Sequence, residues 1–286
     1  MKILLFGNEY QQRYASDLRH LVDVLRQRNA CIAVEKEFHK YLHTALHIDT
    51  STLECCQAED MDGDVALSIG GDGTFLRTAR AMARKNVPIM GVNTGHLGYL
   101  AEANVAEIER VVDELYAGRY KIGRRAMLEI SNNCGIKIDN TLALNEVAIL
   151  RQDTCSMLGM RTWVNGIDLT TYRGDGLVIS TPTGSTAYNL SVGGPLLEPT
   201  AHVMVLSPIS AHSLTMRPLV LRDDSEIEIE TNSRTPQYLV SLDGEVHSFP
   251  TGSAITVRKA SIFVKVVETI NHNFADTLRR KLMWGQ

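Results

Sequence analysis

The chain has 286 residues, a length that predicts two domains at about 150 residues each, with ample chain for a core. Its 44% hydrophobic and 22% charged residues, with only 8 prolines, are typical of a soluble globular protein and exclude disordered, collagenous and membrane classes. Since 29 lysines and arginines face 33 aspartates and glutamates, the net charge is -4, so no global positive field favours nucleic acid, and an anionic ligand needs local donors.

The five cysteines are odd in number and form no CxxC pair, which argues against a disulfide framework or a zinc ribbon. We expect them to be reduced thiols. The first apolar run, residues 3–6, is too short for a signal peptide, and no run approaches the length of a membrane span. The sequence therefore predicts a cytoplasmic protein without a membrane partner.

The first third of the chain alternates short apolar runs with segments of helical periodicity. The predicted strands are residues 3–6, 31–34, 65–69 and 87–92. The predicted helices are residues 18–25, 74–85 and 105–117. This alternation favours a parallel sheet wrapped by helices, with ligands at the carboxyl ends of the strands.

After about Gly118 the pattern changes to β-type segments separated by turn clusters, such as residues 226–230 and 261–266. Near the end, Phe274, Leu278 and Leu282 recur every four residues after a capping segment at 271–273, which predicts a last helix. We therefore expect a Rossmann-like α/β domain over residues 1–118 and a mostly β, sandwich-like domain over residues 119–270. A carboxyl-terminal helix over residues 271–286 is expected to pack back on the first domain.

The most informative segment is residues 65–77, VALSIGGDGTFLR, in which a buried strand leads through glycines and one aspartate into a helix. Glycines at such a junction let backbone amides approach phosphate oxygens, and the helix dipole favours negative charge. A carboxylate there repels phosphate unless it accepts a proton or contacts magnesium, so Asp72 indicates phosphoryl chemistry on a hydroxyl. The alternative is a tight turn in which Asp72 only caps the helix.

Two nucleotide fingerprints are missing from the sequence. The first βα turn, residues 7–12, lacks GxGxxG, which disfavours a dehydrogenase, and no GxxxxGK[ST] motif occurs, which disfavours a Walker-type ATPase. A hydrolase built on Ser68 is also disfavoured, because the nucleophile elbow is incomplete and Ser68 lies within an apolar strand.

A second glycine-bearing loop, residues 93–100, leaves the sheet at the same edge and could form the opposite wall of a crevice. It contains Asn93 and His96, and His96 is either a base or a structural hydrogen-bonding residue. In the β half, residues 181–191, TPTGSTAYNLS, concentrate hydroxyls, an amide and a phenol suited to a polar, uncharged ligand surface. Asn145 with Glu146, and Arg173 with Asp175, add amides and charges on turns that could equally be solvated.

These segments, in this order and followed by Gly193-Gly194-Pro195, resemble the bacterial NAD kinases over most of the chain. The GGDGT element alone is also similar to that of lipid kinases of the diacylglycerol and sphingosine type and of phosphofructokinases. The resemblance implies transfer of the ATP γ-phosphoryl group to the 2'-hydroxyl of the adenosine ribose of NAD, giving NADP, with a divalent metal such as magnesium. It also implies an active site between the two domains and a homodimer or homotetramer.

The resemblance further implies that Asp72 is the general base. It adds neighbours of the substrates in the first domain: Gly71, Gly73, Arg77 and Asn93. Candidate dinucleotide contacts in the second are Asn145, Glu146, Arg173, Asp175, Thr186, Ala187, Tyr188, Asn189, Ser191 and Glu245. Of these, Asp175 is expected at the nicotinamide end, and Glu245 stands where many relatives place an amide. The segment 151–156 carries no clear family signature, and it either brings a residue to a neighbouring subunit or contributes nothing to the site.

Two alternatives stay open at this point. One is a lipid kinase of the GGDGT type, although the sequence has no basic amphipathic stretch for a membrane surface. The other is a non-catalytic dinucleotide sensor, which would not need the carboxylate of Asp72.

Overall fold

The computed structural model describes residues 1–94, 98–101, 103–153, 156–270 and 273–285. The chain divides into two compact units, one of residues 1–124 with 264–286 and the other of residues 125–263. Residues 264–270, which the sequence pattern assigns to the second domain, thus belong to the first unit. Two long strands, β7 (Tyr120–Asn132) and β18 (Ala254–Thr269), each contribute residues to both units.

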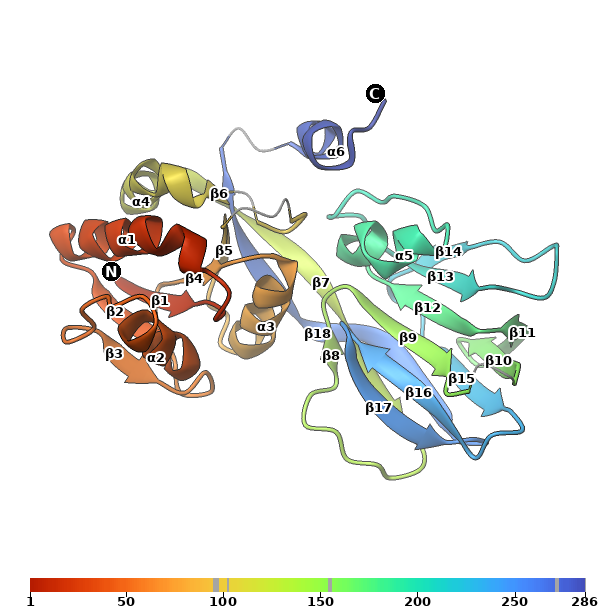
Figure 1. Cartoon of the computed structure of the whole chain (residues 1–286). Helices are drawn as coiled ribbons and strands as arrows, with labels where there is room; N and C mark the ends of the chain where they lie inside the picture. The colour runs from red at the N-terminus through yellow and green to blue at the C-terminus, as the bar shows by residue number, and fades with distance from the viewer. Residues whose placement is uncertain (95–97, 102, 154–155, 271–272, 286) are drawn as a thin grey trace. The chain divides into compact units, whose positions relative to one another are not determined.

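The first unit is an α/β fold (Figure 1). Its other strands are β1 (Lys2–Phe6), β2 (Cys31–Glu35), β3 (Glu54–Cys56), β4 (Val65–Ile69), β5 (Ile89–Asn93) and β6 (Ala103–Asn104). Its helices are α1 (Ala15–Gln27), α2 (Lys36–Thr44), α3 (Asp72–Ala83), α4 (Ile108–Tyr116) and α6 (Phe274–Leu282), with 3-10 turns η1 (Gln12–Tyr14) and η2 (Val105–Glu107).

The strands β5-β4-β1-β2-β3 lie in this order and are all parallel. All of them except β3 appear in the sequence as apolar runs, because helices cover both faces of a parallel sheet. One face carries a single apolar cluster that includes buried side chains of α1, α2 and α4. Helix α3 adds none of its described side chains to that cluster, although Phe75, Ala79 and Met82 are buried, so it covers the opposite face.

The predicted α/β class is confirmed, and the predicted strands and helices of this unit are present. Helix α2 and strand β3 are not predicted. The short strand β3 has an exposed or half-exposed burial pattern, so it lacks the apolar run that marks its neighbours. The last helix, α6, is present and is capped by Asn273, whose side chain accepts a hydrogen bond from the Asp276 amide. Asn271 and His272 lie outside the described residues.

The second unit consists mainly of antiparallel strands. Its elements are β8 (Leu142–Ala143), β9 (Glu146–Arg151), β10 (Leu158–Val164), β11 (Ile167–Gly174), β12 (Gly176–Ser180), β13 (Val203–Ile209), β14 (Leu219–Arg222), β15 (Ile227–Asn232), β16 (Gln237–Leu242) and β17 (Glu245–Pro250), with η3 (Thr183–Thr186) and α5 (Tyr188–Ser191). One sheet runs β11-β10-β15-β18 and the other β14-β13-β12-β9-β16-β17. Both sheets bury side chains in one apolar cluster, which confirms the predicted mostly β, sandwich-like unit.

Strand β15 illustrates why this unit folds as it does. Ile227 and Ile229 are fully buried while Glu228 and Glu230 are exposed, as the period-two pattern predicts for a sheet with one face in the core. Within the described ranges, no helix is both long and apolar enough to cross a bilayer. The described cysteines, Cys31, Cys55, Cys56 and Cys134, are free, and Cys155 lies outside the described residues.

Candidate functional site

The glycine-rich segment between β4 and α3 is held in one conformation by the protein itself. Gly70 has φ +147°, a value open to glycine, and a Cβ there would lie 2.6 Å from Thr74 Oγ1. Gly71 is the N-cap of α3 and Asp72 is its first residue. Asp72 is therefore not the cap that the alternative interpretation assigned to it.

Gly71 and Gly73 differ from Gly70 because the fold does not require them. A Cβ added at either position would meet no atom of the described residues within 4 Å, and neither has a positive φ. Glycine is used where a backbone turns sharply or where something approaches it closely. Since the turn does not need these two glycines, they leave free space at the amino end of α3, where unpaired amides favour an anion.

The carboxylate of Asp72 is fixed by backbone amides of the segment that follows β5. Its Oδ2 accepts a hydrogen bond from the Tyr99 amide at 2.8 Å, and its Oδ1 accepts one from the Leu100 amide at 2.9 Å. Gly98 lies against the same carboxylate, because a Cβ at that residue would be 2.5 Å from Oδ1. The structure thus joins the two glycine-bearing loops at Asp72. Gly95, His96 and Leu97 lie outside the described residues.

The first βα turn also supports this segment. The Arg77 guanidinium donates to the carbonyl of Gly7, and Gln11 Nε2 donates to the carbonyl of Ile69 at 2.6 Å. Arg77 is therefore already engaged in joining α3 to the end of β1. Asn93, the last residue of β5, pairs in register with Asn104 of β6.

In the second unit, the backbone of the candidate residues Asn145 and Glu146 is held by a carboxylate that lies far away in the sequence. Asp243 accepts hydrogen bonds from three successive amides, those of Leu144 at 2.7 Å, Asn145 at 2.8 Å and Glu146 at 3.1 Å. Asp243 has φ +51° and Gly244 has φ +90°, so both lie in the left-handed region that a two-residue hairpin turn requires. An Asp-Gly pair predicts that turn, but not its bonds to residues far away in the sequence.

The hydroxyl-rich segment, residues 181–191, contacts the carbonyl groups of Leu144 and Asn145. The Thr181 amide donates to the Asn145 carbonyl at 2.9 Å, and the Thr181 hydroxyl donates to the Leu144 carbonyl at 2.6 Å. A Cβ at Gly184 would lie 2.1 Å from the Asn145 carbonyl oxygen, so only glycine fits there. These contacts bring residues 144–146 and the 3-10 turn η3 together, as expected for parts of one site.

The buried side-chain atoms that have no hydrogen-bond partner among the described residues include three in this part of the second unit: Asn145 Oδ1, Glu146 Oε2 and Thr183 Oγ1. Buried polar atoms nearly always have a partner, because an unpaired one costs about 1–3 kcal/mol. Because these three atoms belong to the segments that carry the other candidates, they are available to hydroxyl or amide groups of a ligand. Such an unpaired set is not visible in a sequence.

The electrostatics connect further candidates. Burial and then the charge of Asp243 raise the pKa of Glu146 to about 7, while the Tyr188 amide acts in the opposite direction. Burial, followed by the charges of Asp175 and Glu146, raises the pKa of Tyr188. Asp175 and Glu146 thus both lie close enough to Tyr188 to affect its phenol. Asp175 also forms an ion pair with Arg151 at 3.1 Å, a partner that the sequence did not indicate.

The remaining candidates of the 181–191 segment fall into two groups. Thr186, Ala187, Tyr188 and Ser191 are half-buried or exposed and can meet a ligand. Asn189 is fully buried, and its amide is engaged: Nδ2 donates to the Ser185 and Pro195 carbonyls, and Oδ1 accepts from the Ser207 hydroxyl at 2.6 Å. Asn189 thus shapes the turn, and its side chain is not presented to solvent.

Two candidates lie in other surroundings. Arg173 is exposed and lines a cavity of about 300 Å³ with Met157, Asn232 and Arg234. Glu245 is the first residue of β17, and its Oε1 lies 3.3 Å from His247 Nε2. The structure describes Gln152, Asp153 and Ser156 of the 151–156 segment, while Thr154 and Cys155 lie outside the described residues.

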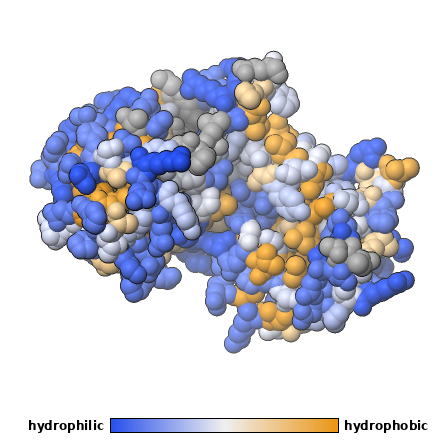
Figure 2. Space-filling model, viewed as in Figure 1, coloured by the Kyte–Doolittle hydropathy of each residue, from blue (hydrophilic) through white to orange (hydrophobic). Residues whose placement is uncertain are grey.

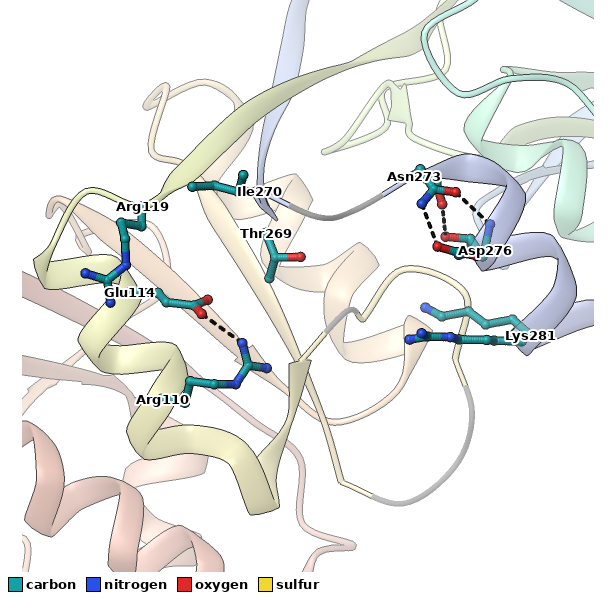
Figure 3. Close-up of a pocket in the computed structure, with 10 residues that line it drawn as sticks. Arg110, Glu114, Arg119, Thr269, Ile270, Asn273, Asp276 and Lys281 are labelled. Atoms are coloured by element: carbon teal, nitrogen blue, oxygen red, sulfur yellow. Dashed lines mark hydrogen bonds and ion pairs between the residues drawn. The ribbon is translucent and has the colours of Figure 1, made fainter.

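A larger cavity, of about 560 Å³, belongs to the first unit (Figure 3). It lies between α4 and α6 and is lined by Arg110, Arg119, Asp276 and Lys281, among others. Asp72 does not line it. Arg110 is engaged by Glu107 and Glu114, each at 2.8 Å, and the Asp276 carboxylate forms an ion pair with Arg279 at 2.5 Å. The charged side chains that line this cavity are therefore largely paired with one another or with neighbours. The region beside Asp72 differs, because it offers free space over Gly71 and Gly73.

Comparisons with known proteins cover nearly the whole chain. Residues 3–120 match the ATP-NAD kinase N-terminal domain, and residues 144–269 match the ATP-NAD kinase C-terminal domain. An NAD kinase of Bacteroides fragilis is 42% identical over 285 residues, covering 100% of this chain and 98% of the relative. An NAD kinase of Porphyromonas gingivalis is 37% identical, covering 99% and 98%.

Solved structures share the fold. A yeast NADH kinase complexed with NADH superposes with a TM-score of 0.90 at 22% identity and covers 100% of this chain and 88% of that one. An NAD kinase from Archaeoglobus fulgidus in complex with ATP superposes with a TM-score of 0.76 at 23% identity and covers 98% and 99%.

Proposed function

Because this chain belongs to the ATP-NAD kinase family over both of that family's domains, we propose that it phosphorylates NAD on the 2'-hydroxyl of the adenosine ribose, with ATP as donor and NADP as product. The family relationship does not favour a lipid kinase. The observation that carries the proposal is the geometry of Asp72, a carboxylate fixed at the amino end of a helix beside two glycines that the fold does not need.

Asp72 is the general base of this proposal. In phosphoryl transfer the transition state is loose, so positioning of the attacking hydroxyl matters more than early removal of its proton. A carboxylate held by the Tyr99 and Leu100 amides has a fixed orientation, so it can accept a hydrogen bond from the ribose hydroxyl and take its proton late. The reaction forms a bond between the ribose oxygen and the γ-phosphorus and breaks the bond to ADP.

The amino end of α3 is proposed to bind phosphate. Gly71 and Gly73 leave room for an anion to approach the backbone amides, and the helix dipole adds a favourable potential. Asn93 and Arg77 are proposed neighbours of the substrates. Since Arg77 donates to the Gly7 carbonyl, it also fixes the first βα turn beside the glycines.

The dinucleotide is proposed to meet the second unit. Asn145 and Glu146 offer buried oxygens without partners, which suit ribose hydroxyls. Further proposed contacts are Arg173, Asp175, Thr186, Ala187, Tyr188, Ser191 and Glu245. Asn189, whose side chain is buried, is proposed to act through the shape of its turn. Asp175 is assigned to the nicotinamide end.

A divalent metal such as magnesium is proposed to enter with ATP. Within the described residues there is no group of three or more His, Cys, Asp or Glu side chains that could hold a metal ion. In this proposal the metal is bound mainly by phosphate oxygens and water, as is usual for magnesium in phosphoryl-transfer sites. When bound, it would neutralise charge on the phosphates.

We also propose a homodimer or homotetramer in the cytoplasm. On the face shown in Figure 2, hydrophobic residues are more frequent over the second unit than over the first. Ile167 and Val246 of that unit are 73% and 54% exposed, which favours burial against another copy. Free thiols at the described cysteines suit a reducing compartment. Light scattering of the purified protein measures the oligomeric state.

The decisive experiment incubates the purified protein with ATP, magnesium and NAD and follows NADP by an NADP-specific dehydrogenase. NADP formation that depends on all three supports the proposal. Release of ADP only with diacylglycerol or sphingosine would establish a lipid kinase instead. Saturable NAD binding without any turnover would establish a sensor.

A further inference from the structure

Lys281, in the last turn of α6, is bound to the segment that holds Asp72. Its ammonium donates to the carbonyl of Tyr99 at 2.7 Å and to the carbonyl of Ala101 at 2.7 Å. It also lies 5.7 Å from the centre of the Tyr99 ring. Figure 3 shows Lys281 on α6, so a side chain near the end of the sequence contacts a segment about 180 residues earlier.

The same segment uses its other backbone groups for Asp72. The amides of Tyr99 and Leu100 donate to the two carboxylate oxygens, while the carbonyls of Tyr99 and Ala101 accept from Lys281. Residues 98–101 are therefore bound on one side by an anion and on the other by a cation. The Tyr99 carbonyl and the Leu100 amide belong to one peptide group, so that group is polarised by both partners and its two hydrogen bonds strengthen one another.

The segment has little room to move toward the sheet. A Cβ at Gly91 of β5 would lie 2.6 Å from the Ala101 Cα, and one at Gly98 would lie 2.5 Å from Asp72 Oδ1. Such close packing fixes residues 98–101 against β5 and Asp72. The ammonium of Lys281 adds a further restraint, because it binds the Tyr99 and Ala101 carbonyls of the same segment.

We propose that Lys281 is a positioning residue for phosphoryl transfer: by binding the Tyr99 and Ala101 carbonyls it holds residues 98–101 so that their amides orient the Asp72 carboxylate. This inference rests on the proposed role of Asp72. Lys281 does not touch the reacting atoms in this account. It acts through the backbone of a segment that the sequence did not connect with the last helix.

The first test is Lys281→Met, which keeps a long side chain of good helix propensity and removes the donors. Because misplacement by about 1 Å can cost 10²-fold, we expect kcat to fall by about 10- to 100-fold, with the KM for NAD changed by less than about 2-fold. The matched control is Arg280→Met, which removes a positive charge from the same turn at an exposed residue and should leave kcat unchanged. Equal kcat in Lys281→Met and the wild type would overturn the proposal.

Two further measurements separate positioning from loss of structure. Lys281→Arg keeps the positive charge and offers five N–H donors, so it should recover part of kcat. Hydrogen exchange of the Tyr99 and Leu100 amides should accelerate in Lys281→Met and not in Arg280→Met. If Lys281→Met lowers the melting temperature so far that rates cannot be compared, Lys281→Gln, which keeps one donor group, takes its place. A loss of activity without faster exchange at these amides contradicts the proposed path.

The double variant Lys281→Met with Asp72→Asn tests whether Lys281 acts through Asp72. If it does, adding Lys281→Met to Asp72→Asn should lower kcat by less than about 2-fold relative to Asp72→Asn alone. The effects of residues that act as a unit are not additive. A further 10-fold loss would show that Lys281 acts elsewhere. The single variant Asp72→Asn keeps the two ideas apart: if it retains turnover, the proposed role of Asp72 fails, whereas if only the Lys281 variants are normal, only the present inference fails.

Discussion

The two units use the same device, a carboxylate that accepts hydrogen bonds from successive backbone amides, in opposite ways. In the first unit the carboxylate is the candidate reacting group, since Asp72 is held by the amides of Tyr99 and Leu100. In the second unit the carboxylate is the anchor, since Asp243 holds the amides of residues 144–146. The candidate groups there are Asn145 and Glu146, whose side-chain oxygens remain partly unpaired.

The difference shows where each site is rigid and where it is open. Around Asp72 the carboxylate is satisfied, and the free space lies over Gly71 and Gly73. Around Asp243 the backbone is satisfied, and the unpaired atoms belong to buried side chains. We therefore expect changes at Asp72 to affect turnover first and changes at Asp243 to affect stability first.

The largest effect is expected from Asp72→Asn. Loss of a general base typically lowers the rate by about 10² to 10⁴, and NAD affinity should change little because the groups of the second unit are intact. Steady-state kinetics and titration calorimetry with NAD measure the two quantities, and circular dichroism controls for folding. Turnover near that of the wild type would remove Asp72 from the reaction.

Asp243→Asn should mainly reduce stability. Asparagine tolerates the left-handed backbone of this turn, but it loses the charge that serves three amides, so we expect the free energy of unfolding to fall by about 2–4 kcal/mol. Urea denaturation measures the change. The control is Asp168→Asn, which breaks an exposed ion pair with Arg161 and should cost at most about 1 kcal/mol. Similar losses in both variants would mean that the three amides do not depend on Asp243.

Glu146→Gln should remove a pH dependence of stability. The pKa of Glu146 is raised to about 7 in the folded protein, so the folded state binds a proton more tightly than the unfolded chain does. Glu146 therefore lowers stability as pH rises from its ordinary pKa through about 7. The glutamine variant should gain on the order of 2–3 kcal/mol relative to the wild type between pH 5 and pH 8.

Urea denaturation of both proteins without NAD, across that range of pH, tests this expectation. A constant difference between the two proteins would show that Glu146 does not titrate there. When Asp243→Asn is also present in both proteins, the pH-dependent difference in stability between Glu146 and its glutamine variant should shrink. The charge of Asp243, one of the causes that raise the pKa of Glu146, is then removed.

The smallest effects distinguish two kinds of glycine. Gly73→Ala should leave stability unchanged or raise it by about 0.5–1 kcal/mol, because no described atom meets the new Cβ and alanine favours a helix. The KM for ATP should nevertheless rise. Gly184→Ala should destabilise by about 1–3 kcal/mol, because its Cβ meets the Asn145 carbonyl. Melting curves compare the two, and equal shifts would mean that both glycines serve the fold alone.

The sequence predicts the elements whose residues carry a continuous signal. Strands such as β4 are buried on both faces and read as apolar runs, and β15 alternates strictly. Strand β3 has only three residues, none of them buried, so nothing marks it. Helix α2 buries only Phe38, Tyr41 and Leu42, about one turn of a pattern.

The site divides in the same way. Asp72 can be recognised because its neighbours in the sequence are glycines whose chemistry is specific. Asp243 and Lys281 cannot, because each acts on backbone groups about 100 and 180 residues away, and backbone groups are the same in every residue. The hydrogen bond that Asn189 of α5 accepts from Ser207 likewise comes from a distant element, strand β13.

The turn at Asp243 has a consequence for the order of folding. The hairpin of β16 and β17 is local and can close early, but its carboxylate meets the amides of residues 144–146 only when a segment 97 to 99 positions away has docked. Contacts that form late contribute little to the folding rate and mainly slow unfolding. The three hydrogen bonds of Asp243 should therefore prolong the lifetime of the native state rather than speed its formation.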